Sequence, residues 1–147
     1  MSASPESPLR GGCNCGAVRF EVRGPFTSAL YCHCHRCQRR TGVAAAASAR
    51  LDRAHFAITR GADLIRSWEP DGGMPKAFCA NCGSHLFAGS LDGDALAVRL
   101  GAIDGDPGIR PEYRQWVSSA APWEAIPDDG LPRYEGARPQ LGSGGGG

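Results

Sequence analysis

The sequence predicts one mainly β domain, and three observations support this prediction. Short segments in which apolar and polar residues alternate recur along the chain, which is typical of strands that bury one face. Turns that contain glycine and proline separate these segments, and few stretches favour a helix. The length of 147 residues suits a single domain with a core of its own.

The expected strands follow one another at short intervals. The first is expected at 18–23, where Val18, Phe20 and Val22 alternate with charged residues. Segment 42–49 is ambiguous, because its alanines favour a helix, but its short length and the glycine before it favour a strand. The other strands are expected at 27–31, 55–59, 64–69, 85–90, 95–100 and 113–118.

The domain itself is expected to span residues 10–136. Residues 1–9 are rich in serine and proline and are expected to be disordered. Residues 137–147 end in a run of glycine and are expected to form a flexible tail.

Charge and hydropathy exclude some classes of partner. The formal net charge of +1 gives no electrostatic reason to expect binding to nucleic acid or to a membrane surface. No apolar run approaches the roughly 20 residues that cross a bilayer. The N-terminus lacks a basic segment followed by an apolar one, so a cytoplasmic location is expected. The oligomeric state is left open.

The chain contains seven cysteines, a high and odd number. An odd number does not suit a fully disulfide-bonded framework, and a reducing cytoplasm would not maintain one, so metal ligation is the better interpretation. The cysteines fall into three groups: Cys13 and Cys15; Cys32, Cys34 and Cys37; Cys79 and Cys82.

The two outer pairs resemble each other, because each is followed at once by a glycine, Gly16 or Gly83. A tight ligand turn often needs a positive φ, which glycine adopts without steric cost. Together the four outer cysteines predict a closed structural zinc site.

This partition leaves a triplet, Cys32, Cys34 and Cys37, which has the ligand number of a catalytic zinc site with one open position. Two alternatives remain open. A histidine could close the site as a fourth ligand, or the triplet could be a metal-free redox group. The candidate histidines are His33, His35, His55 and His85.

A zinc ion held by three thiolates is a weak Lewis acid, but it suits the binding of a substrate thiolate that stays nucleophilic. Arg36 and Arg39 follow the triplet closely and are candidate substrate-binding residues, because guanidinium groups bind carboxylates in a bidentate manner. The alternative is that these arginines, with Arg40, form a solvated basic loop.

Several motifs are similar to those of one known family, and they cover about residues 10–136. The segments are 12–20, 32–37, 78–87, 101–104 and 121–128. They resemble the glutathione-dependent formaldehyde-activating enzyme (Gfa) family, also called the CENP-V domain family, at all seven cysteines. One departure is Arg114, which stands where relatives often carry histidine.

The resemblance implies a β-tent-type fold with two zinc sites. It implies structural zinc at Cys13, Cys15, Cys79 and Cys82, and catalytic zinc at Cys32, Cys34 and Cys37. It also implies a carbon–sulfur lyase that forms S-hydroxymethylglutathione from glutathione and formaldehyde. A small-molecule thiol of the glutathione type is therefore the expected partner. The alternatives are a zinc-stabilised binding or scaffold module without catalysis, and a thiol redox protein.

Overall fold

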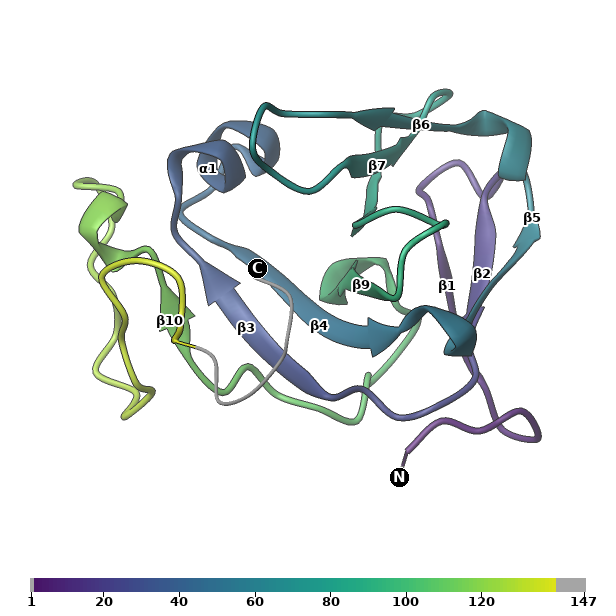
Figure 1. The fold of residues 1–147 in the computed structure, drawn as a ribbon, viewed down its shortest axis with the longest axis horizontal. Helices are drawn as coiled ribbons and strands as arrows, with labels where there is room; N and C mark the ends of the chain where they lie inside the picture. The colour runs from purple at the N-terminus through teal and green to yellow at the C-terminus, as the bar shows by residue number, and fades with distance from the viewer. Residues whose placement is uncertain (1, 140–147) are drawn as a thin grey trace.

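Two β-sheets and one short helix make up the described part of the chain, residues 2–139 of this computed structural model, and confirm the mainly β prediction (Figure 1). The smaller sheet has the order β1-β2-β5, and the larger has the order β10-β3-β4-β9-β8-β7-β6. The strands of the smaller sheet are β1 (Leu9–Gly12), β2 (Arg19–Val22) and β5 (Phe56–Arg60).

The larger sheet is antiparallel except for the parallel pair of β10 and β3. Its strands are β3 (Ser28–Cys32), β4 (Ala46–Asp52), β6 (Ile65–Trp68), β7 (Lys76–Cys79), β8 (His85–Ala88), β9 (Ala95–Arg99) and β10 (Arg114–Gln115). The helix is α1 (His35–Thr41), and 3-10 turns lie at Arg53–His55, Ala62–Leu64, Leu100–Ala102 and Val117–Ser119.

The core lies between one face of the larger sheet and the smaller sheet. Phe56 joins the two, since its ring centroid lies 5.0 Å from that of Phe20 and 5.1 Å from that of Phe87. Alternation places Phe20 and Val22 in this core, as the pattern at 18–23 predicts. Other fully buried side chains of the core include those of Val18, Leu51, Leu86, Leu96 and Val98.

The ambiguous segment 42–49 is a strand in its second half, because β4 begins at Ala46. It runs through the centre of the larger sheet, where pairing with β3 and β9 overrides the helical preference of alanine. The strand expected at 113–118 is limited to Arg114–Gln115. Two strands were not expected from the sequence: β1, in which Leu9 pairs with Val22, and β7.

The structure describes the C-terminal end of the chain only in part. Residues 140–147 of the expected tail 137–147 lie outside the described residues. Just before them, the Arg138 guanidinium stacks 4.1 Å from the centroid of the Tyr113 ring.

Within residues 2–139, no helix has the length and apolar character needed to cross a bilayer.

Candidate metal centres and substrate pocket

The four outer cysteines come together from two loops far apart in sequence. Cys13 and Cys15 lie in the connection between β1 and β2, and Cys79 and Cys82 lie at the turn between β7 and β8. All four sulfurs lie within 4.8 Å of one another. The Cys13 and Cys15 sulfurs are 3.5 Å apart, and those of Cys15 and Cys79 are 3.9 Å apart. Zinc–sulfur bonds of about 2.3 Å place tetrahedral sulfurs about 3.8 Å apart, so this group fits such an ion.

The two loops have the same local geometry, which explains the glycine after each pair. Gly16 has a φ of 76° and Gly83 a φ of 79°, as the ligand-turn prediction requires. The Gly16 N–H donates to the Cys13 carbonyl, and the Gly83 N–H donates to that of Cys79. Each turn thereby directs both cysteine side chains of its pair toward the centre.

Polar groups around these sulfurs favour the thiolate form. The Val18 N–H donates to the Cys13 sulfur at 3.2 Å, and the Asn81 side-chain amide donates to the Cys15 sulfur at 3.3 Å. The Ser84 hydroxyl and backbone N–H lower the pKa of Cys82 to about 5. Such donors accompany metal-bound thiolates, because they stabilise the negative sulfur.

The triplet forms where β3 meets α1. Cys32 ends β3, Cys34 is the N-cap residue of α1, and Cys37 lies in its first turn. The Cys34 sulfur accepts the Cys37 N–H at 3.3 Å, which fixes the register of the two side chains. Within the described residues, the three sulfurs form a second group within 4.8 Å, and no histidine or carboxylate joins it.

Contacts among the three thiols of the triplet shift their pKa values in opposite directions. Hydrogen bonds from the thiols of Cys32 and Cys37 lower the pKa of Cys34 to about 2. The same contacts raise the pKa of Cys37, since its proton is held between neighbouring sulfurs. A metal ion would displace these protons, because a thiol binds metal as its thiolate. All seven cysteines are free thiols, and neither group contains a disulfide.

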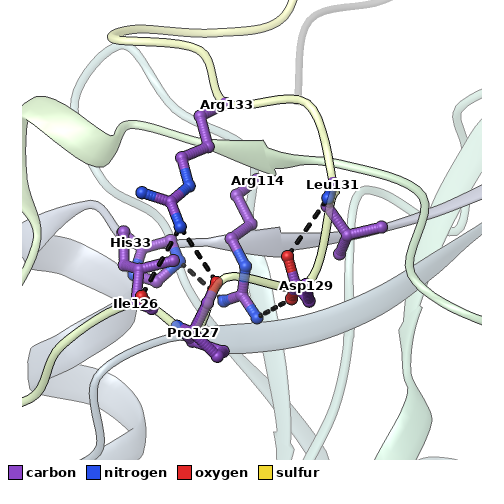
Figure 2. Close-up of polar contacts among 7 residues, drawn as sticks. All are labelled: His33, Arg114, Ile126, Pro127, Asp129, Leu131 and Arg133. Carbon is purple, nitrogen blue, oxygen red and sulfur yellow. Dashed lines mark hydrogen bonds and ion pairs between the residues drawn. The ribbon is translucent and has the colours of Figure 1, made fainter.

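His33 lies between two triplet cysteines in sequence but is not part of their group. Its side chain is only 3% exposed, and its Nε2 lies 3.2 Å from the Arg114 guanidinium (Figure 2). Arginine can only donate, so this nitrogen is the acceptor and the proton resides on Nδ1. Burial, and then the Arg114 charge, lower the pKa of His33, which keeps the ring neutral.

Arg114 holds this arrangement together. Its guanidinium donates to Asp129 at 2.8 Å (Figure 2). The same guanidinium lies 4.3 Å from the centroid of the Tyr31 ring. It lines a separate cavity of about 270 Å³ with Tyr31 and His33. The neighbouring Gln115 faces the triplet instead, because successive side chains on a strand point to opposite faces.

A cavity of about 490 Å³, called the triplet pocket here, opens beside Cys32, Cys34 and Cys37. In Figure 1, α1 and the β6–β7 hairpin lie above β3 and β4, and residues from α1, β3, β4 and the segment leading into β7 line the pocket. Ala88 and Ala97, paired on β8 and β9, leave space on its floor because their side chains are small.

The expected substrate-binding arginines have different positions. Arg36 lines the triplet pocket and donates to the Asp71 carbonyl at 2.7 Å, which holds the loop before β7 against α1. Arg39 is exposed and does not line the pocket. Arg40 faces Phe78, with its guanidinium 5.7 Å from the ring centroid.

Three further basic residues line the triplet pocket and were missed in the sequence analysis. They are Arg50 of β4, Lys76 of β7 and Arg99 of β9. A signal existed for Arg99, which stands in the strand predicted at 95–100, and for Arg50, which directly follows the segment at 42–49. Lys76 had no such signal, because β7 was not among the predicted strands. Alternation of buried and exposed residues along a strand does not give the order of strands in a sheet. The sequence therefore did not show which face of the larger sheet carries the pocket.

Trp116 lines the same pocket with a backbone rarely adopted by a large residue. It has a φ of 58° and is the one non-glycine residue with positive φ in the described chain. Such a conformation costs of order 1 kcal/mol and persists only where surrounding contacts impose it. Here the Trp116 N–H donates to the Gly136 carbonyl, and this contact fixes the turn at the pocket.

Comparison with known proteins identifies a family and a similar fold. Residues 8–119 match the family model described as glutathione-dependent formaldehyde-activating enzyme. Among solved structures, the chain is similar to a Rhodobacter sphaeroides protein with a TM-score of 0.56 and 22% identity, over 85% of this chain and 98% of that one. At this identity the likeness concerns the fold alone. No curated protein matches the chain significantly.

Proposed function

The chain belongs to the glutathione-dependent formaldehyde-activating enzyme family, and we propose that it is a zinc-dependent carbon–sulfur lyase that forms and cleaves thiol–formaldehyde adducts. One observation supports this most strongly. Three cysteine sulfurs gather within 4.8 Å beside a cavity of about 490 Å³, with no fourth ligand among the described residues. Catalytic sites keep such a position open, whereas structural sites fill it.

Zinc bound by Cys32, Cys34 and Cys37 would supply one open position, at which a substrate thiol is held as a nucleophilic thiolate. In the synthetic direction, the substrate sulfur forms a bond to the formaldehyde carbon, and the carbonyl π electrons move to oxygen, which takes a proton. The product is an S-hydroxymethyl adduct, a hemithioacetal. The reverse sequence breaks the carbon–sulfur bond and releases the aldehyde, so atoms and charge balance both ways.

The protein side chains of the triplet pocket complete this proposal. The developing alkoxide needs a positive or donating group, and the basic lining of the triplet pocket can supply one. Arg36 holds the loop at 70–73 over the triplet through Asp71, and so restricts access of water. Gln115 pairs with Cys32 across β10 and β3 and keeps that ligand in place.

The experiment is exchange NMR with ¹³C-formaldehyde and glutathione, with and without the zinc-loaded protein. We expect faster exchange between hydrated formaldehyde and its glutathione adduct, and a rate near the uncatalysed one with Cys34→Ser. An Arg39→Gln variant is the matched control, because Arg39 is exposed and lies outside the triplet pocket. No acceleration by fully metal-loaded protein would reject glutathione and formaldehyde as substrates.

A further inference from the structure

The triplet pocket has a charge pattern that neither the family nor the metal sites explain. Four basic residues line it, namely Arg36, Arg50, Lys76 and Arg99, and none of the described residues that line it is acidic. Elsewhere in the described chain, arginines pair with acids in five ion pairs, and neither Lys76 nor Arg99 belongs to any of these. Lys76 and Arg99 therefore bring positive charge to a pocket whose described lining residues include no carboxylate.

Strand register places two of these charges on opposite sides of a floor of small residues. Arg99 pairs with Ser48, which pairs in turn with Leu30. The next row on the same face runs from Arg50 through Ala97 and Ala88 to Lys76. Because residues of one row point to the same face, Lys76 and Arg99 both reach the cavity beside Cys32.

Both side chains differ from basic groups on a solvated surface, because Arg99 is held by a hydrogen bond and Lys76 is half-buried. Arg99 donates to the buried Ser48 hydroxyl at 2.6 Å, which fixes its guanidinium at the pocket wall. Lys76 is half-buried, and burial followed by the charge of Arg99 lowers its pKa. The three cysteines of the triplet act in the opposite direction, so Lys76 lies within electrostatic reach of all of them.

Arg36 has a different task. Its guanidinium donates to the Asp71 carbonyl and thereby closes the loop over the pocket, so it is part of the wall. A ligand that enters beside the triplet thus meets Lys76 and Arg99 as donors. It meets no carboxylate that could bind a positively charged group.

We infer that Lys76 and Arg99 select the substrate thiol by its negative charge, so that the substrate class is a thiol bearing at least one carboxylate. Recognition of an ammonium group plays no part. This inference rests on the proposed function, since it assumes that the thiol sulfur sits at the triplet.

Calorimetric titration of the zinc-loaded protein with 3-mercaptopropionate and 3-mercaptopropionamide tests the inference. The two thiols have nearly the same size and differ in charge. We expect the carboxylate to bind about tenfold more tightly or better, as charge-assisted hydrogen bonds imply, and cysteamine to bind most weakly. The preference is expected to shrink as salt is raised.

Single substitutions test whether Lys76 and Arg99 cause the preference for the carboxylate over the amide. Lys76→Gln and Arg99→Gln are each expected to reduce the ratio of the two affinities severalfold, whereas Arg39→Gln leaves it unchanged. Equal binding of acid and amide by the wild type would overturn the charge selection and leave the open thiol site intact. An unchanged ratio in both variants would overturn the assignment to Lys76 and Arg99. If no thiol bound at all, the proposed function would fail together with the inference.

Discussion

The sulfurs of Cys15 and Cys79 lie 3.9 Å apart, although 64 positions separate these residues in the chain. Cys15 belongs to a loop of the smaller sheet and Cys79 to a strand of the larger one. A metal ion held by these residues with Cys13 and Cys82 would link the two sheets. The four-cysteine group is therefore expected to act on stability and not on chemistry.

The first prediction concerns this link. Cys82→Ser removes one sulfur at an exposed position, so it creates no cavity in the core. We expect Tm to fall by about 10 °C or more, because binding to the native state alone stabilises it. A strong chelator should lower the Tm of the wild type markedly and that of Cys82→Ser much less. Equal effects of the chelator on both would contradict a structural metal at this site.

Gly61 permits a close backbone contact and offers a second test. It has a φ of 75°, and a Cβ there would overlap the carbonyl oxygen of Ala17. Gly105 has nearly the same φ, 73°, with open space around it, and is the matched control. Urea unfolding should show a loss of about 1 kcal/mol for Gly105→Ala, which is the cost of positive φ alone. A clearly larger loss is expected for Gly61→Ala, and similar losses would rule out the overlap.

Arg114 is a buried arginine that lies outside the triplet pocket, at 7% exposure. Arg114→Gln removes the ion-pair partner of Asp129 and the donor to His33 Nε2, and it takes the cation from the Tyr31 ring. We expect a loss of about 2 to 4 kcal/mol in the free energy of unfolding. Because Arg114 faces away from the triplet pocket, thiol affinity should change little. A large loss of thiol binding with unchanged stability would contradict the assignment of Arg114 to stability and not to thiol binding.

Asp129 makes the stability of this contact dependent on pH. The hydrogen bond from Arg114 lowers the pKa of Asp129 below its ordinary value of 3.8. A lowered pKa means that the contribution is complete above about pH 4 and is lost as pH falls through the folded-state value. Asp129→Asn should therefore be less stable than the wild type by a constant amount from pH 7 to pH 5. The difference should narrow only below about pH 4, and urea unfolding at several pH values measures it.

The sequence was sufficient for the parts of the fold and site that depend on local pattern. Alternation at Phe20 and Val22 predicted a half-buried strand, and the glycines after Cys15 and Cys82 predicted positive φ in the ligand turns. The division of seven cysteines into four and three follows from their spacing, and the two groups in space have the same members.

Other features depend on contacts that spacing does not encode. The strand at Leu9–Gly12 contains two glycines and forms only because β2 offers it a partner. His33 was a candidate fourth ligand, but Arg114, distant in sequence, pairs with its ring on the other side of the strand. Lys76 and Arg99 come from strands that meet the triplet through the order of the larger sheet.

The central claim is that a closed four-cysteine site and an open three-cysteine site coexist in one chain. The most direct test is the metal content of the purified wild type and of Cys34→Ser, with circular dichroism as a check of the fold. We predict two zinc ions per chain in the wild type, and about one in Cys34→Ser with the fold retained. A single zinc in the wild type, or collapse of the fold in Cys34→Ser, would contradict the account.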